Sequence, residues 1–274
     1  MLLNEAVGSV QGQVVCLCIP AEARVQAHQV EAELARRGAI VLGSAPNVEK
    51  IRATSVPDAL AQSDRLRIEV ADRMMVVTAD GRVDVDEVCA EQITYALSVG
   101  CRVEFLGPTM RMHLDPDLYN MVYRRRKTVE VRLADARRAA LAPGTLIVFV
   151  RRDGAENELL CRVTMVERFG HRAGLLAMVD PSAVLPGSNR SGLAARLEEI
   201  YPESVGHEHL AIHVQCLGEA DPARERDNAA HRAHAPARHG AGVLIVNQDS
   251  EVLLVPARGE RDCALRPHHP GPGR

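Results

Sequence analysis

A short run of charged and polar residues near the middle of the chain has the types and spacing of a ligand-binding strand. Lys127 and Thr128 begin the run, and Glu130 and Arg132 follow at alternate positions. Alternate residues of a strand share one face, so Thr128, Glu130 and Arg132 are expected to lie on the same side. The other side carries the apolar residues that we expect in the core, namely Val129, Val131 and Leu133.

Each charged residue of this run offers a different interaction. Lys127 presents a compact ammonium group, and Glu130 can accept a hydrogen bond from an exocyclic amine such as that of cytosine. Arg132 can orient Glu130 or hold a phosphate in a bidentate contact, and Arg126 belongs to a basic cluster, 124–127, suited to backbone phosphates. The plainer alternative is an exposed strand face with a Glu130–Arg132 ion pair worth less than about 1 kcal/mol.

The elements around this run predict a small α+β domain over residues 110–217. Strands are expected at 128–133, 146–150, 159–166 and 209–217, because β-branched and aromatic residues concentrate there. Helices are expected at 114–123 and 193–200, where apolar residues recur at core spacing. Several strands with a few short helices are typical of a small barrel.

Four pieces of this segment resemble the ASCH domain, a relative of the PUA RNA-binding fold. They are 127–132, 143–149, 200–202 and 211–214, in the order and spacing of the family. The resemblance implies a PUA-like β-barrel that binds RNA or nucleosides beside the strand that begins at Lys127. One branch of the family hydrolyses acetylated cytidine with a lysine, a threonine and a glutamate. Here Lys127 matches the lysine, Glu130 stands at the threonine position, and no carboxylate lies near Pro186.

Residues 13–108 predict an α/β domain with a parallel sheet, because short apolar runs alternate with helical patterns. The expected strands are 14–19, 39–42, 74–78 and 102–106, and the expected helices are 23–34, 57–71 and 87–99. Gly38 is a candidate helix C-cap. Ligands of such sheets bind beyond the carboxyl ends of the strands, which here means the loops after Ile19, Leu42 and Thr78.

Within this domain, the stretches 68–77, 91–97 and 100–103 resemble the nucleoside 2-deoxyribosyltransferase-like group. The resemblance implies a nucleoside-shaped pocket with Asp64, Asp72, Glu91 and Gln92 around it. The nucleophilic glutamate of the family corresponds to Gln92, and a carboxamide cannot form the glycosyl ester. We therefore expect an inactive nucleoside-binding domain. Glycosidic cleavage by water activated at Asp64 or Glu91, or a purely structural domain with solvated carboxylates, are the alternatives.

The end of the chain predicts a flexible linker at 218–238 and a hairpin within 239–274. The linker is rich in Ala, Arg, Asp, Glu, His and Pro and has no apolar stripe. The apolar runs on either side of the turn 247–250 resemble the opening hairpin of a Nudix hydrolase. The Nudix helix that holds Mg²⁺ is absent from 239–274. We expect a truncated, disordered or docked hairpin without Nudix catalysis.

Two sets of metal-ligand residues have plainer interpretations. Cys16 and Cys18 share one face of a predicted buried strand, where core thiols are expected rather than a metal pair. Three histidines near the last strand, His207, His209 and His213, have the same strand parity, but no fourth ligand is visible in the sequence. We therefore predict no metal and no cofactor.

Composition narrows the function further. The chain has 274 residues, a formal net charge of −3 and 46% hydrophobic residues, which excludes a globally polybasic protein and a disordered one. It has no Trp, four Tyr and three Phe, so wide aromatic stacking on single-stranded RNA is disfavoured. Seven cysteines at irregular spacing and no apolar run long enough for a membrane span favour a cytoplasmic protein.

We therefore expect an RNA- or nucleoside-binding protein that uses the ASCH-like domain, with RNA or a small nucleoside or nucleotide as its partner. The alternative is a hydrolase of modified nucleosides or nucleotides, with Lys127 and Glu130 as its catalytic residues. The sequence predicts neither the exact ligand nor the oligomeric state.

Overall fold

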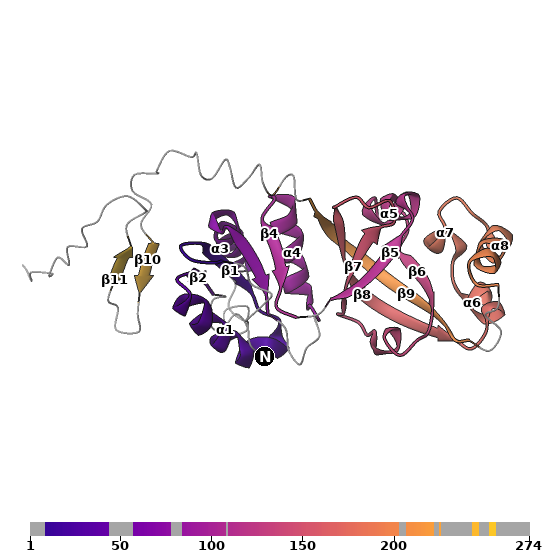
Figure 1. The fold of residues 1–274 in the computed structure, drawn as a ribbon, viewed down its shortest axis with the longest axis horizontal. Coiled ribbons are helices and arrows are strands. Elements are labelled where there is room, and N and C mark those ends of the chain that lie inside the picture. The colour runs from indigo at the N-terminus through magenta and orange to yellow at the C-terminus, as the bar shows by residue number, and fades with distance from the viewer. Residues whose placement is uncertain are drawn as a thin grey trace, which may run out of the picture. The chain divides into compact units, whose positions relative to one another are not determined.

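The computed structural model describes residues 9–43, 57–77, 84–107, 109–202, 207–221 and 225, together with two strands further along the chain. The chain forms two compact units, Met1–Arg226 and Asp227–Arg274. The first unit contains a parallel sheet and a curled mixed sheet (Figure 1). No helix in the described ranges is long and apolar enough to cross a membrane.

The parallel sheet has the strand order β2-β1-β3-β4 and agrees with the alternating pattern of the sequence. Its strands are β1 (Val14–Cys18), β2 (Ile40–Leu42), β3 (Arg73–Val76) and β4 (Arg102–Phe105). Its helices are α1 (Arg24–Arg36), which follows the short 3-10 helix Ala21–Ala23, and then α3 (Pro57–Val70) and α4 (Glu87–Ser98). Gly38 follows α1 with a φ of 82°, which confirms the predicted glycine at the helix end.

The second sheet is five-stranded, with the order β5-β7-β8-β9-β6. Its strands are β5 (Met110–Leu114), β6 (Val129–Leu133), β7 (Leu146–Arg151), β8 (Glu158–Phe169) and β9 (His209–Ala220). β5 and β7 are parallel, and the other neighbours are antiparallel. The sheet curls as half of a barrel (Figure 1). β5 and β6 are its two edges, and they are not paired with each other in the described residues. The sequence interpretation missed β5 and placed a helix at its last residue.

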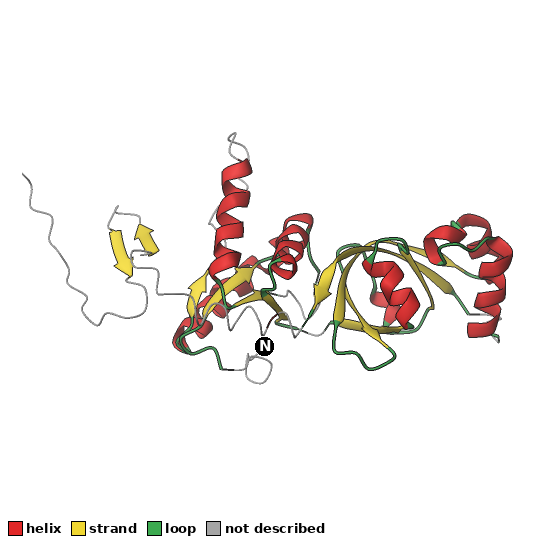
Figure 2. Ribbon diagram, turned by 90° about the horizontal axis from the view of Figure 1, so that it is seen from above, coloured by secondary structure: helices red, strands yellow, loops and turns green. Residues whose placement is uncertain are grey.

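Helices lie on both faces of this curled sheet. α5 (Pro116–Tyr123) packs Tyr119 and Val122 into the core formed by the inner face of the sheet, and the strands curve around it (Figure 2). Three further helices cover the outer side of β6 and β9: α6 (Arg172–Met178), α7 (Pro181–Val184) and α8 (Arg190–Ile200). A short 3-10 helix, Arg138–Ala140, follows β6.

The two sheets share one hydrophobic core through α4. Buried residues of this helix, including Ile93 and Leu97, cluster with Met74 of the parallel sheet and with Leu160 and Leu217 of the curled sheet. The main chain also joins the two parts, since Val85 N donates to Gly144 O at 2.8 Å. Residues 13–108 and 110–217 therefore pack as parts of one unit.

The end of the chain differs in one respect from the prediction. β9 extends to Ala220, so the first three residues of the predicted linker 218–238 belong to a strand. Gly218 lies against Leu97 of α4, and Ala220 packs on the core cluster that contains buried residues of α4, which explains the extension. β10 (Val243–Val246) and β11 (Val252–Val255) form the predicted antiparallel hairpin. The rest of 239–274, and with it the predicted disorder, lies outside the described residues.

Candidate functional site

A tight turn after α5 brings Lys127 into the interior. Arg125 has a φ of 57°, the left-handed conformation that ends many helices. Arg126 N and Lys127 N both donate to Met121 O, at 2.8 and 3.0 Å. This turn reverses the chain so that Lys127 points inward while 124–126 remain exposed.

The ammonium group of Lys127 is buried and surrounded by acceptors. Its side chain is 3% exposed. Nζ donates to Val129 O and to Val184 O, both at 2.7 Å, and lies 3.1 Å from Glu130 Oε2. An ammonium has three N–H donors; two of them are used by the main-chain carbonyls, and the carboxylate pairs with the charge. Lys127 therefore ties the start of β6 to α7.

Glu130 lies between two cations. Its side chain is 4% exposed, and Oε1 is 2.7 Å from Arg132 Nη1. Glu130 pairs with Ile212 of β9, whose side chain belongs to the inner core, so the carboxylate lies on the inner face of the curled sheet. The predicted alternation is confirmed, because Val129 and Val131 pack on the opposite side under the helices. The alternative of an exposed Glu130–Arg132 pair is wrong, because the two side chains are only 4% and 15% exposed.

One oxygen of this carboxylate retains acceptor capacity. Glu130 Oε2 is buried and accepts no hydrogen bond of good geometry. Its contact to Lys127 Nζ at 3.1 Å is an ion pair, and the two hydrogen bonds of that ammonium go to main-chain carbonyls. A buried carboxylate oxygen with spare capacity suits a ligand N–H donor.

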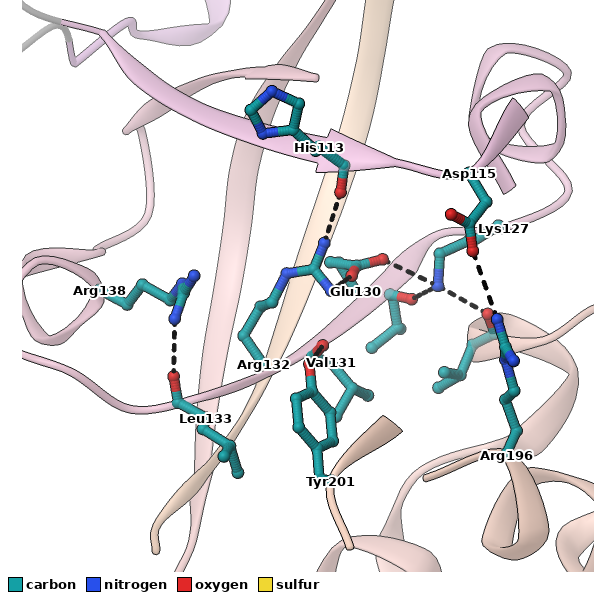
Figure 3. A network of polar contacts seen from close by, with 12 residues as sticks. His113, Asp115, Lys127, Glu130, Val131, Arg132, Leu133, Arg138, Arg196 and Tyr201 are labelled. Carbon is teal, nitrogen blue, oxygen red and sulfur yellow. Dashed lines mark hydrogen bonds and ion pairs between the residues drawn. The ribbon is translucent and has the colours of Figure 1, made fainter. Parts of the chain in front are cut away.

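Arg132 bridges the two edges of the curled sheet. We call the line along which β5 and β6 face each other without backbone pairing the seam. From β6, Arg132 Nη2 donates to His113 O of β5 at 2.8 Å, across the seam (Figure 3). Burial acts to lower the pKa of Arg132, but Glu130 and Tyr201 outweigh that effect, so the pKa is raised. The guanidinium is therefore held charged at the seam.

Residues from three other elements surround the seam. Asp115, which precedes α5, lies 3.3 Å from Arg196 of α8 and 3.2 Å from Arg152. Tyr201, after α8, donates its hydroxyl to Val131 O at 3.2 Å. The sequence interpretation missed these groups. Asp115 had a local signal, as an Asp before Pro116 at a helix start, and Tyr201 stands in the piece 200–202 that resembles the ASCH domain.

The remaining predicted ligand residues are on the surface. Arg126 and Thr128 are exposed and have no side-chain contact to the buried Lys127–Glu130–Arg132 cluster that the structure records. The main chain of Thr128 is used in the fold, since its N–H donates to Ala183 O and its carbonyl accepts from Val214. The predicted set therefore divides into a buried cluster of three residues and an exposed basic turn.

In the parallel-sheet part, two of the four predicted pocket residues come together. Gln92 Nε2 of α4 donates to Asp64 Oδ2 of α3 at 2.7 Å. Asp64 also pairs with Arg67, which reaches Gly43 O at the end of β2. Burial lowers the pKa of Arg67, and burial raises the pKa of the nearby Cys16 thiol to about 12.

The other two predicted pocket residues, Asp72 and Glu91, make no contact to Asp64 or Gln92 that the structure records, so their place in a common pocket stays a prediction. Asp72 accepts from Val14 N at 2.7 Å, at the amino ends of β1 and β3. Ligands of parallel sheets bind at the opposite ends. Glu91 is exposed, because the next helix position turns about 100° away from Gln92. Asp86, which was missed, does lie at the carboxyl ends, where it caps α4 and accepts from Ala21 N at 3.3 Å.

The candidate metal ligands are dispersed. Cys16 and Cys18 are buried core thiols, as predicted. His209 is fully buried, His207 is exposed, and His213 contacts Glu167 at 2.8 Å. Within the part of the chain that the structure describes, no group of three or more His, Cys, Asp or Glu side chains could hold a metal ion.

Comparison with known proteins finds matches among solved structures alone. No protein-family model matches the chain, and no curated protein matches it. Two solved structures are similar to 40% of the chain. The hypothetical protein PH0355 has 21% identity, 99% of its own length covered and a TM-score of 0.35. Protein PF0455 from Pyrococcus furiosus has 23% identity, 98% coverage and a TM-score of 0.32. Neither name describes a ligand or an activity.

Proposed function

We propose that this chain binds RNA or a nucleoside-type ligand at the seam. The observation that carries the proposal is the buried Glu130 carboxylate, which lies between Lys127 and Arg132 and keeps one oxygen without a hydrogen bond. Removing charges from water is costly, and a buried polar atom without a hydrogen-bond partner calls for an explanation, which a bound ligand would supply. The resemblance to the ASCH domain favours the same strand for ligand binding.

The chemistry of the seam fits an aminated base. Glu130 Oε2 suits an exocyclic amine, as found on cytosine. Arg132, with a side chain 15% exposed, is the cation of the cluster that is most open to solvent. The exposed turn 124–126 supplies three arginines for backbone phosphates. A base held at Glu130 with its phosphate toward this turn would use both predicted sets of residues.

Binding is favoured over hydrolysis by the surroundings of Lys127. A general base must offer a lone pair to the proton that it removes. The amine of Lys127 instead has three protein acceptors around it, at 2.7, 2.7 and 3.1 Å. A hydrolase would have to break these contacts first. The proposed role of Lys127 is to hold Glu130 and β6 in place.

The parallel-sheet part is proposed as a second, catalytically inactive nucleoside-binding region. Its support is the Asp64–Gln92 hydrogen bond, which joins α3 to α4. Gln92 cannot act as a glycosyl acceptor, and its amide already donates to Asp64. Asp64 and Gln92 would together contact a hydroxyl group of the nucleoside's sugar.

Thermal shift with the full chain tests the proposal at the seam. The probes are cytidine, adenosine, their monophosphates, acetylated cytidine and a short structured RNA, each in low salt. A ligand at 100 times its dissociation constant stabilises the folded state by about 2.7 kcal/mol. For a unit of this size that corresponds to a rise of roughly 5–10 °C in Tm. The Glu130→Gln variant should lose the part of this rise that binding at the seam contributes.

Glu104→Gln is the matched control. Glu104 also lies between two arginines, 3.0 Å from Arg73 and 2.8 Å from Arg102, but on the parallel sheet. Both variants should unfold at a lower temperature than the wild type, and only Glu104→Gln should keep the full ligand-induced rise. Equal rises in the two variants, or no rise for any probe with the wild type, would refute binding at Glu130.

A further inference from the structure

Two buried cysteines face each other across neighbouring strands of the curled sheet. Cys161 of β8 is directly opposite Cys216 of β9 in the antiparallel register. Both side chains belong to the core on the inner face, so they lie on the same side of the sheet. Both thiols are free.

The register gives these residues the spacing that a disulfide needs. Directly opposed residues of antiparallel strands have Cα atoms about 4.5–5.5 Å apart, and disulfides span about 4.4–6.8 Å between Cα atoms. The register shifts between Leu160 and Cys161, so the ladder is irregular beside the pair and tolerates small adjustments. No large movement of the backbone is required to join the two sulfurs.

The surroundings make the two thiols unequal. Cys161 is 0% exposed, and burial raises the pKa of its thiol. Cys216 is 7% exposed, and the hydrogen bond from Cys161 lowers the pKa of its thiol, with Arg125 acting in the same direction. A thiolate is the reactive form of cysteine. Cys216 therefore meets an oxidant first, and Cys161 is its adjacent partner.

We propose that Cys161 and Cys216 form a redox-active dithiol that closes to a disulfide under peroxide. The Cys216 thiolate attacks one oxygen of hydrogen peroxide, which forms a sulfenic acid and releases hydroxide. The Cys161 thiol then attacks the Cys216 sulfur, which expels the sulfenic oxygen, and that oxygen leaves as water after taking up the thiol proton. In sum, two thiols and one peroxide give one disulfide and two waters. The second step occurs within the core, so Cys161 needs no exposure of its own.

Another buried thiol pair provides a matched control. Cys18 lies on β1 and Cys89 on α4, with Cys18 Sγ 4.0 Å from the Cys89 carbonyl oxygen. These two residues are 0% and 2% exposed. They share burial and proximity with the proposed dithiol but lack its cross-strand register and a member as accessible as Cys216, which is 7% exposed.

The experiment is peroxide treatment of the reduced full chain, followed by alkylation and mass spectrometry of tryptic peptides without reduction. Cleavage after arginine separates the two cysteines into peptides 153–162 and 197–224. The expected result is a linked pair of these peptides and the loss of two thiols. Cys216→Ser should abolish both signals, and Cys161→Ser should give a sulfenic or sulfinic acid on Cys216 without the link. Cys18→Ala should behave as the wild type.

Three results would overturn the inference. One is a wild-type protein that keeps all its thiols at peroxide doses that oxidise free cysteine. Another is equal thiol loss in Cys216→Ser and the wild type. The third is a set of disulfides that excludes the 153–162 and 197–224 pair. The peptide map of the wild type shows whether the Cys161–Cys216 disulfide forms, even where a serine variant fails to fold.

Discussion

Lys127→Met should destabilise the folded chain far more than the loss of a surface ion pair. The substitution keeps the length and apolar stem of the side chain and removes the ammonium. Two main-chain carbonyls lose donors at 2.7 Å, and Glu130 Oε2 loses a cation at 3.1 Å. A buried acceptor without its donor costs about 1–3 kcal/mol. Glu130 keeps Arg132 at 2.7 Å, so its charge is still paired.

These contributions predict a loss of about 3–5 kcal/mol, which is the range for breaking a buried ion pair. Such a loss is a large fraction of the roughly 5–15 kcal/mol that stabilises a folded domain. Combining Lys127→Met with Glu130→Gln should give less than the sum of the two single losses, with a coupling of about 0.5–3 kcal/mol.

Urea denaturation at pH 7 measures these free energies of unfolding. The control is Arg111→Met, because Arg111 and Glu158 form an ion pair in which the side chains are 47% and 34% exposed. This variant should lose less than about 1 kcal/mol. If Lys127→Met and Arg111→Met lower the free energy of unfolding by the same amount, the buried contacts of Lys127 do not stabilise the fold as the distances indicate.

Four further variants test other features. Gly218→Ala should lower the free energy of unfolding by about 2–4 kcal/mol, because Gly218 has a φ of 153° and a Cβ there would lie 2.9 Å from Leu97 Cδ1. Chemical denaturation measures this loss, and a value below about 0.5 kcal/mol would contradict the packing of α4 on β9. Arg125→Gly should raise the free energy of unfolding by about 0.5–1 kcal/mol, because its φ is 57°; an unchanged or lower Tm would contradict this. Burial lowers the pKa of His209, so the unfolded state binds a proton that the folded state does not, and the free energy of unfolding falls as pH drops below about 6.5. His209→Phe should remove this contribution to the pH dependence of stability, which is at most about 1.4 kcal/mol per pH unit. Urea titrations at about pH 7.5 and 5.5 measure it. If the proposed RNA binding is correct, Arg126→Ala should flatten the dependence of log affinity on log salt by about 0.7, as measured by titration at several salt concentrations, and an unchanged slope would exclude its phosphate contact.

Much of the fold could be predicted from local patterns in the sequence. The parallel strands and their helices agree with the structure to within one or two residues at most ends, because apolar runs, helical spacing and Gly38 are local signals. β5 was missed because Arg111 and His113 alternate with apolar residues over only five positions, directly before a clear helix. Short alternating runs carry little information without a partner strand.

The candidate site also has one part that local sequence patterns predict and one part that depends on the tertiary structure. The alternation of residues 128–133 determined that Glu130 and Arg132 share a face opposite Val129 and Val131, since side chains alternate along any strand. That alternation could not determine which face meets solvent. In an isolated sheet the polar face is exposed, but here the sheet curls and the helices α6 to α8 cover the apolar face.

The sequence by itself therefore determined the residue types, the strand and the face that could bind a ligand. Only the tertiary structure decided that Glu130 is buried between Lys127 and Arg132, and that Arg132 reaches His113 across the seam. It likewise brought Asp64 to Gln92 while separating Asp72 from them. The physical reason is that burial and pairing depend on contacts between residues far apart in the chain, which the curl of the sheet and the packing of the helices create.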